Sequence, residues 1–257
     1  MELIASIVVY RSFSEVLPAI ESLKRSMRGI SGRIVIIDNS DGDEYYRRFT
    51  AHFAKDKSVS VIKSPRNGGY GAGNNLALEH KAKYHLVMNP DVIVGKDTIR
   101  SCIVYMDKHA DVVLATPRIT DERGVTQYLC RRFPSLFDLI LRRMPSVIRA
   151  RFAARLGRYE MRDMPYDKSM DIDWASGAFL FMRQDAFRAN PFDERYFMYF
   201  EDTDLCRQLH TQGRIVYVPE TSVVHAWGKG SHGNAGLFKA HVVSMIHYFN
   251  KWGWKLW

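Results

Sequence analysis

The stretch Leu3-Ile-Ala-Ser-Ile-Val-Val-Tyr10 is an apolar run rich in isoleucine and valine. Such a run is typical of a strand that is buried on both faces, and hence of a central strand in a parallel sheet. Apolar side chains then recur at helical spacing from Phe13 to Met27, and Arg33–Ile37 is a second candidate for a buried strand. Strand, helix and strand in this order form a βαβ unit. The sequence therefore predicts an α/β fold with a mixed, mainly parallel central sheet flanked by helices.

The rest of the chain continues this pattern. A helix is expected at Asp97–His109, and further strands are expected at Val59–Ile62, His85–Met88, Val112–Thr116, Phe179–Met182, Ile215–Val218 and Val223–His225. Ligands of such sheets bind beyond the carboxyl ends of the strands. Asp38 stands at such an end, where it is either a turn-forming residue or a contact to a nucleotide base or ribose.

A glycine-rich segment follows the third strand. Four glycines lie within residues 68–73, and a helix is expected to begin near Asn74. Without side chains in the way, the backbone N–H groups of such a loop can approach an anion closely. The Gly-Lys-Ser/Thr ending of a Walker A loop is missing, and the spacing is not a clean Gly-x-Gly-x-x-Gly. Taken alone, this loop is a weak indication of phosphate or nucleotide binding.

The fourth strand ends in Asn89-Pro90-Asp91. Proline cannot continue a central strand, so Asp91 is expected at a sharp exit from the sheet. Carboxylate oxygens are the preferred ligands of Mg²⁺ and Mn²⁺, which typically use one or two carboxylates together with substrate phosphates. Asp91 is therefore a candidate metal ligand.

A second acidic site lies within residues 192–209, where a run of aromatic residues leads into Glu201, Asp202 and Asp204. Leu205 and Leu209 follow at helical spacing, so the acids open a helix whose apolar face points inward. Acids are common in a first turn because the helix dipole favours them. Aromatic neighbours could also desolvate a carboxylate and tune it as a general base. Successive helical residues turn by about 100°, so Asp202 and Asp204 point in largely opposite directions, and Asp202 and Glu201 remain the candidates.

The chain of 257 residues carries 37 Lys and Arg against 28 Asp and Glu, a net charge of +9. A basic excess suits nucleic acid, anionic lipid or phosphorylated small molecules. Arginines interleaved with apolar residues crowd residues 127–168, which predicts either solvated helix faces or a surface that meets an anionic membrane or a diphosphate. The three scattered cysteines indicate reduced thiols and a cytoplasmic setting. No apolar run approaches the roughly 20 residues of a membrane span.

The last segment, residues 236–257, is expected to form an amphipathic helix that follows a catalytic domain of residues 1–235. Its apolar stripe consists of Val242, Met245, Phe249, Trp252 and Leu256. This helix either packs on the core or lies on a membrane surface, since tryptophan beside lysine is typical of membrane interfaces. The basic loop Ala226–Ser231 just before it, which contains Lys229, could fold over a diphosphate.

Four elements stand in a recognisable order: Asp38, the stretch Asn67–Asn75, Asn89-Pro90-Asp91, and Phe200–Leu205. Together they resemble glycosyltransferase family 2, the inverting enzymes with the GT-A fold, and among these the bacterial rhamnosyltransferases of surface polysaccharide synthesis. The resemblance covers about residues 3–232.

The resemblance implies a role for each matching residue. Asp202 would be the catalytic base. Asp91 and His225 would bind Mg²⁺ or Mn²⁺. Asn89-Pro90-Asp91 corresponds to the family's Asp-x-Asp metal motif, with Asn89 in place of the first Asp. The nucleotide-sugar would contact Val9, Tyr10, Arg11, Asp38, Asn67, Gly69, Tyr70, Gly71, Asn74, Asn89 and Pro90. The sugar and acceptor pocket would include Trp174, Ser176, Gly177 and Glu201.

The resemblance further implies a dTDP- or UDP-linked donor, with dTDP-rhamnose the first expectation, and a lipid-linked saccharide acceptor. The enzyme would lie peripherally on the inner face of the cytoplasmic membrane. A homodimer is a further expectation, and no nucleic acid is expected as a partner. Transferases using UDP-linked galactofuranose, N-acetylglucosamine or glucose are an alternative. A sugar-nucleotidyltransferase is a poorer match, because Tyr10-Arg11-Ser12-Phe13 lacks the expected glycine-rich loop after the first strand. A non-catalytic nucleic-acid-binding module lacks a helix-turn-helix, zinc or RNA-binding signature.

Overall fold

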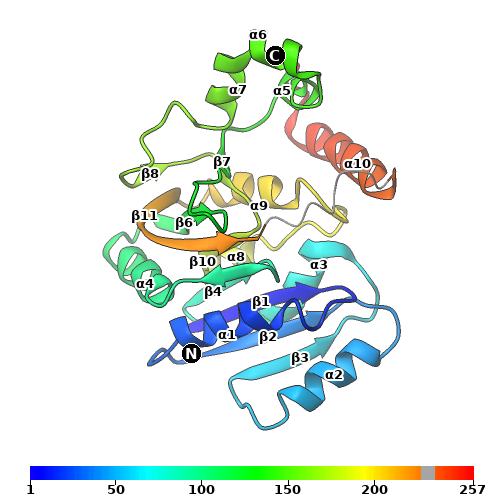
Figure 1. Ribbon diagram of the computed structural model, residues 1–257, viewed down its shortest axis with the longest axis vertical. Coiled ribbons are helices and arrows are strands. Elements are labelled where there is room, and N and C mark those ends of the chain that lie inside the picture. Colours follow the sequence, from blue (N-terminus) through cyan, green and yellow to red (C-terminus); the bar gives the residue numbers. More distant parts are fainter. Residues whose placement is uncertain (227–234) are drawn as a thin grey trace.

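The computed structural model describes residues 1–226 and 235–257. Its centre is a nine-stranded sheet in the order β3-β2-β1-β4-β10-β6-β11-β5, with β8 paired to β11 (Figure 1). The strands of this sheet are β1 (Leu3–Val9), β2 (Gly32–Asp38), β3 (Val59–Lys63), β4 (Tyr84–Met88), β5 (Val92–Val94), β6 (Val112–Thr120), β8 (Met170–Asp171), β10 (Phe179–Arg183) and β11 (Arg214–His225). A separate pair is formed by β7 (Cys130–Arg131) and β9 (Trp174–Ala175).

The sheet is mixed, as the sequence predicts. Strands β3, β2, β1 and β4 run parallel, whereas β10 runs antiparallel to both β4 and β6. All seven residues of β1 are buried, which confirms the prediction of a central strand. The two short strands expected at 215–218 and 223–225 are one strand, β11, whose pairing with β6 shifts register between Val218 and Ser222.

Helices cover both faces of the sheet (Figure 1). They are α1 (Leu17–Ser26), α2 (Glu44–His52), α3 (Gly69–Asn75), η1 (Leu76–Glu79), α4 (Thr98–Lys108), α8 (Gln184–Ala189) and α9 (Glu201–Leu209). Successive side chains of β1 point to opposite faces of the sheet. Leu3 and Ile7 pack with α1 and α4, while Ile4 and Val8 pack with η1 on the other side.

The prediction of a glycine-rich loop at residues 68–73 is wrong, because helix α3 already begins at Gly69. Packing explains the glycines. A Cβ at Gly69, where φ is +90°, would lie 1.9 Å from the carbonyl oxygen of Phe197. A Cβ at Gly71 would lie 2.8 Å from the Phe192 side chain. Intrinsic helix propensity disfavours glycine, and tertiary packing overrides it here.

Residues 127–168 contain β7 and three short helices, α5 (Leu136–Leu141), α6 (Ser146–Arg151) and α7 (Ala153–Tyr159). This helical insert lies beside the last helix, α10 (Ala235–Trp252), at the top of Figure 1. The chain after α10 pairs with the start of α5, since the amides of Leu136 and Phe137 donate to the carbonyls of Lys255 at 2.8 Å and Leu256 at 3.1 Å.

Helix α10 packs on the core through most of its predicted stripe. Met245, Phe249 and Trp252 belong to a cluster with the buried Tyr196 and Phe200. Leu256, the last residue of the predicted stripe, lies beyond the end of α10 at Trp252 and has 64% of its surface exposed. The apolar residues that α10 exposes are instead Phe238, Val243 and Ile246. Among the helices that the structure describes, none is both long and apolar enough to cross a bilayer.

Candidate active site

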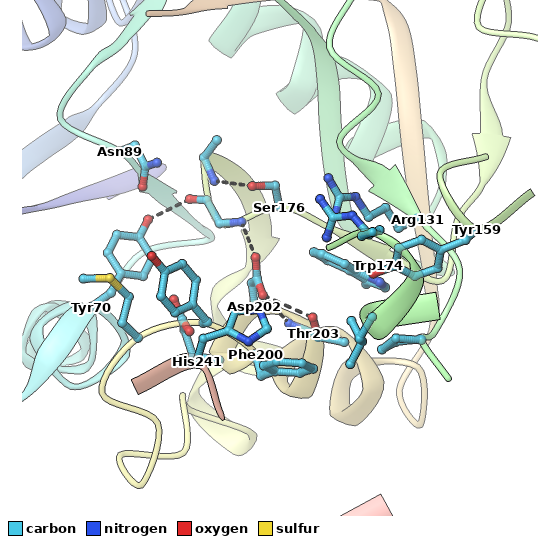
Figure 2. A pocket seen from close by; sticks show the side chains of 18 residues that line it. Tyr70, Asn89, Arg131, Tyr159, Trp174, Ser176, Phe200, Asp202, Thr203 and His241 are labelled. Atoms are coloured by element: carbon cyan, nitrogen blue, oxygen red, sulfur yellow. Dashed lines mark hydrogen bonds between the residues drawn. The ribbon is translucent and has the colours of Figure 1, made fainter. Parts of the chain in front are cut away.

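A cavity of about 390 Å³ opens where α9, the β9–β10 turn, the helical insert and α10 meet (Figure 2). It brings together seven residues that the sequence analysis singled out: Tyr70, Asn89, Trp174, Ser176, Gly177, Glu201 and Asp202. Helix α9, which carries Asp202, and the β9–β10 turn, which contains Gly177, are about 25 residues apart in sequence and line the same cavity.

The backbone conformation just before α9 directs the acidic side chains of its first turn toward this cavity. Tyr199 and Phe200 have φ angles of 69° and 66°, in the left-handed region that non-glycine residues rarely adopt. Such a conformation costs on the order of 1–3 kcal/mol per residue and persists only where the surroundings enforce it. Here α10 supplies that support, because the ring of His241 contacts both aromatic rings and the Ser244 hydroxyl donates to the carbonyl of Met198 at 2.9 Å.

Asp202 projects into the cavity as a hydrogen-bonded carboxylate (Figure 2). Its Oδ2 accepts the Gly177 amide at 2.9 Å, and its Oδ1 accepts the amide and hydroxyl of Thr203 at 2.7 and 3.2 Å. Burial raises the pKa of Asp202, and these hydrogen bonds offset only part of that effect. A carboxylate with a raised pKa is a stronger proton acceptor, which suits a general base.

Glu201, the other candidate, lies in a different environment. It is buried, and its Oε2 has no hydrogen-bond partner among the described residues. Burial and the neighbouring charge of Asp202 raise the pKa of Glu201 well above its ordinary value. The donors of Gly177 and Thr203 favour the charged form of Asp202 and fix its orientation, so Asp202 is the better candidate for the base.

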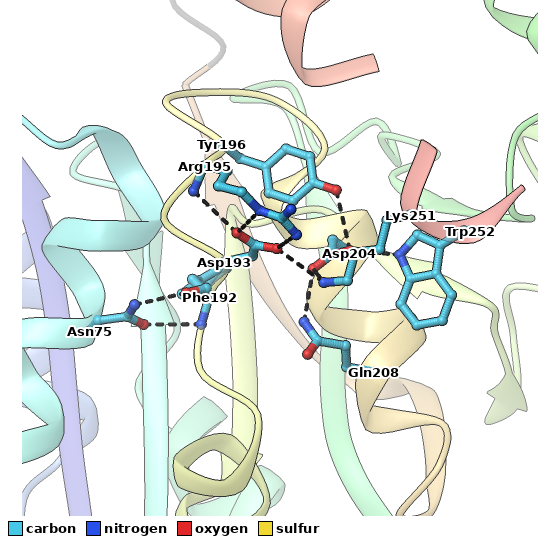
Figure 3. A network of polar contacts seen from close by, with 9 residues as sticks. All are labelled: Asn75, Phe192, Asp193, Arg195, Tyr196, Asp204, Gln208, Lys251 and Trp252. Carbon is cyan, nitrogen blue, oxygen red and sulfur yellow. Dashed lines mark hydrogen bonds and ion pairs between the residues drawn. The ribbon is translucent and has the colours of Figure 1, made fainter. Parts of the chain in front are cut away.

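Asp204 points away from the cavity, as the helical rotation predicts. It is fully buried and accepts hydrogen bonds from Trp252 Nε1 at 2.6 Å and from Lys251 Nζ at 2.8 Å. Gln208 and Tyr196 complete the network (Figure 3). Asp204 thus joins α9 to α10, and so braces the helix that carries Asp202.

The residues predicted to hold the nucleotide lie at the carboxyl ends of β1 and β2. Asp38 is fully buried and pairs with Lys63 at 3.0 Å, so its carboxylate already has a cationic partner. Val9 is buried, whereas Tyr10 is 47% exposed and Arg11 reaches Asp41 at 2.6 Å. Within this set, the exposed groups available to a base or ribose are therefore those of Tyr10 and Arg11.

The predicted contacts from α3 have internal partners as well. Asn67 Oδ1 accepts the amide of Gly69 at 3.2 Å, and the fully buried Asn74 accepts the Ser6 hydroxyl at 2.6 Å. The Tyr70 hydroxyl donates to the carbonyl of Gly177 at 2.7 Å. These bonds seat α3 against the turn that holds Asp202, while contacts to a nucleotide remain a prediction.

Asp91 and His225 meet, although 134 positions separate them in sequence. Asp91 Oδ1 lies 3.3 Å from His225 Nε2, and Gln127 Oε1 lies 3.3 Å from His225 Nδ1. Gln127 Oε1 can accept a hydrogen bond from Nδ1–H, which leaves Nε2 unprotonated as a ligand. Within residues 1–226 and 235–257 there is no group of three or more Asp, Glu, His or Cys that could hold a metal. The pair fits an ion that takes its remaining ligands from substrate phosphates and water.

Asn89 and Pro90 directly precede Asp91 in the chain. Positions 227–231 of the predicted basic loop lie outside the described residues.

Sequence reasoning missed several residues of the site, among them Gln127, Arg131, Arg142, Thr203 and His241. The arginine-rich composition of residues 127–168 pointed to the right region. It could not single out Arg131 and Arg142, because their convergence depends on how β7 and α5 pack.

Comparisons with known proteins identify the family of this chain. The family model described as glycosyl transferase family 2 matches residues 5–188. Rhamnosyltransferase WbbL of Escherichia coli (strain K12) is 29% identical over 233 residues, which cover 84% of this chain and 81% of that protein. An N-acetylglucosaminyl-diphospho-decaprenol L-rhamnosyltransferase of Mycobacterium tuberculosis is 30% identical over 192 residues, or 65% of this chain and 59% of that protein.

Among solved structures, GalNAc-T7 with UDP, GalNAc and Mn²⁺ has a TM-score of 0.68 at 14% sequence identity, covering 95% of this chain and 47% of that one. At this identity the likeness shows the fold alone. It confirms the expected GT-A fold.

We expect Asp204→Asn to lower the free energy of unfolding by about 1–3 kcal/mol, because buried donors of α10 lose a charged acceptor. Urea denaturation measures this. Asp111→Asn is the matched control, since it weakens an exposed ion pair with Arg214 that is worth about 0–1 kcal/mol. Equal effects of the two substitutions would show that Asp204 does not brace α9.

Proposed function

Because the chain belongs to glycosyl transferase family 2, we propose that this glycosyltransferase moves L-rhamnose from dTDP-rhamnose onto a hydroxyl of a lipid-linked saccharide in bacterial surface glycan synthesis. Two relatives named as rhamnosyltransferases support the sugar, and the name of the mycobacterial one supports a diphospho-lipid acceptor. The observation that carries the proposal is Asp202, a half-buried carboxylate that hydrogen bonds from Gly177 and Thr203 orient in the cavity. A UDP-linked donor is the alternative, since GalNAc-T7 was crystallised with UDP.

The proposed chemistry is a single displacement. Asp202 accepts the proton of the acceptor hydroxyl while the oxygen of that hydroxyl bonds to the anomeric carbon of the donor. The bond from this carbon to the nucleotide diphosphate breaks, and the configuration inverts as in inverting glycosidases. Gly177 and Thr203 hold the carboxylate in place during the transfer.

Asp91 and His225 would hold Mg²⁺ or Mn²⁺ in this scheme. When bound, the ion would act as a Lewis acid that compensates the charge of the leaving diphosphate. Gln127 would orient the imidazole, and Asn89 would contribute a neutral oxygen where a second carboxylate is absent.

The outer surface of the insert and α10 is the proposed membrane contact. Its exposed apolar residues are Ile140, Met144, Val147, Ile148, Phe238 and Ile246, here called the outer apolar surface. The guanidinium of Arg143 lies 4.9 Å from the ring centroid of Phe238 and links the insert to α10. Apolar side chains next to arginines suit the boundary of an anionic bilayer. On this proposal the protein lies peripherally on the cytoplasmic membrane.

We expect Asp202→Asn to reduce turnover by roughly 10²–10⁴-fold with little change in donor affinity, because the amide keeps the volume but cannot accept the proton. Steady-state kinetics with dTDP-rhamnose and UDP-sugars measure this and identify the donor. The kcat/KM of the wild type should fall as pH drops through the raised pKa of Asp202. Thr203→Val removes a hydrogen bond that favours the charged form, so it should move this midpoint to higher pH.

Two controls accompany Asp202→Asn. Glu201→Gln should keep most of the activity, because burial favours the uncharged form of Glu201, and Asp204→Asn should cost much less in rate than Asp202→Asn. If Asp202→Asn retained more than about a tenth of wild-type turnover, Asp202 would not be the base. If Glu201→Gln alone abolished turnover, Glu201 would take that role.

Asp91→Ala is expected to remove the effect of Mn²⁺ on binding of the donor nucleotide, because the one carboxylate of the metal pair is lost. Thermal shift with dTDP and UDP, each with and without Mn²⁺, measures this, since binding to the native state raises the melting temperature. Asn89→Asp should instead strengthen the effect of Mn²⁺. If Mn²⁺ did not change the thermal shift that the nucleotides cause in the wild type, the metal would have no role in donor binding.

The double substitution Val147→Ser and Phe238→Ser should reduce co-sedimentation with phosphatidylglycerol vesicles, because it removes exposed apolar area from the outer apolar surface. Val104→Ser is the matched control, an equally apolar, exposed residue on α4. Deleting residues 237–257 is unsuitable, because α10 braces α9. Wild-type protein that stays in the supernatant at low salt would contradict the membrane contact.

A further inference from the structure

Two arginines of the insert converge on the wall of the cavity beyond Asp202. Arg131 ends β7 and Arg142 follows α5, and their guanidinium carbons lie 5.8 and 5.9 Å from the ring centroid of Tyr159. Arg131 also lies over the Trp174 ring at 5.5 Å. Figure 2 shows Arg131, Trp174 and Tyr159 on one side of Asp202, with Asn89 and Tyr70 on the other.

The charge on this wall is poorly compensated. Arg131 forms no ion pair within the described part of the chain, and its Nε is buried without a hydrogen-bond partner. The carboxylate nearest to Arg142 is that of Glu160, at 3.7 Å, and Glu160 also binds Arg162 at 2.8 Å. Partial burial and the positive charge of Arg131 lower the pKa of Arg142. Placing two like charges together is unfavourable, so an anionic ligand between them would be stabilising.

A diphosphate suits these two groups in particular. Guanidinium presents a planar fork of N–H donors that binds phosphate oxygens bidentately, and the aromatic rings of Tyr159 and Trp174 hold the forks in place. In the proposed reaction the donor's diphosphate lies near Asp91, on the Asn89 side of Asp202. An anion on the Arg131 side therefore belongs to the acceptor.

We propose that Arg131 and Arg142 form the subsite for the diphosphate of a lipid-linked acceptor, an inference that rests on the proposed function. The acceptor's hydroxyl would then lie at Asp202 and its diphosphate between the two arginines. The lipid would leave past Leu139, which also lines the cavity, toward Ile140 and Met144 of the outer apolar surface. The acceptor would thus place its sugar at Asp202, its diphosphate at the two arginines and its lipid beside Leu139.

The test compares two synthetic acceptors with the donor that the wild type uses. One carries N-acetylglucosamine on a short isoprenoid through a diphosphate, and the other carries the same sugar and chain through a neutral glycosidic link. We expect Arg131→Gln and Arg142→Gln each to raise the KM for the diphosphate acceptor by roughly 10- to 100-fold, the loss of a charged hydrogen bond. The KM values for the neutral acceptor and for the donor should stay unchanged.

Arg131→Lys keeps the charge and should lose less than Arg131→Gln. Arg151→Gln, an exposed arginine of the same insert, is the matched control and should change no KM. Melting temperatures check that each variant is folded, and Arg142→Gln tests the subsite independently should Arg131→Gln unfold.

The outcomes separate the two levels of the proposal. A wild type that uses both acceptors equally well would overturn the diphospho-lipid acceptor, and the subsite with it. A wild type that prefers the diphosphate acceptor, with variants that keep this preference, would overturn the subsite alone. A raised KM for the donor would assign the arginines to the donor's diphosphate and also overturn the subsite.

Discussion

Tyr199 and Phe200 adopt consecutive left-handed conformations directly before α9, and the position of Asp202 depends on this turn. The conformation is costly by itself, so contacts far away in sequence must maintain it. They come from α10, which packs His241 and Tyr248 on the turn and ties Lys251 and Trp252 to Asp204. The geometry of the candidate site therefore depends on tertiary contacts. The first turn of an isolated α9 would not place the carboxylate at the cavity.

The cavity also separates charges by environment. At its centre, hydrogen bonds from Gly177 and Thr203 keep Asp202 able to ionise, although burial raises its pKa. Beside it, burial and the charge of Asp202 raise the pKa of Glu201 well above its ordinary value, and Glu201 Oε2 has no hydrogen-bond partner among the described residues. His241 is neutral near pH 7, because burial and nearby arginines lower its pKa to about 4. The two carboxylates thus lie beside a wall of the cavity that carries Arg131 and Arg142.

The sequence predicts the sheet well because burial on both faces leaves a direct trace in composition, as in β1. It also predicts that Asp202 and Asp204 face apart, since helical rotation is a local property. Gly69 and Gly71 show where sequence-based prediction fails. Glycine there suggests a loop, whereas both positions need glycine because Phe197 and Phe192 pack too closely for a side chain. The same holds for Met245 and Trp252, whose amphipathic spacing shows a buried stripe without showing what buries it. The proximity of Arg131 and Arg142 cannot be predicted from the sequence either, because their contacts with Tyr159 depend on the packing of three separate elements.

The pairing of α5 with the segment after α10 has a consequence for biosynthesis. The amides of Leu136 and Phe137 donate to the carbonyls of Lys255 and Leu256, and Asp204 accepts two of its hydrogen bonds from Lys251 and Trp252. During translation the sheet can form while these residues are still inside the ribosome, whereas the insert and α9 lack their supports. The nascent chain would thus have a nearly complete sheet but an unformed active site, and it would gain the ability to react only once the chain through Leu256 has emerged.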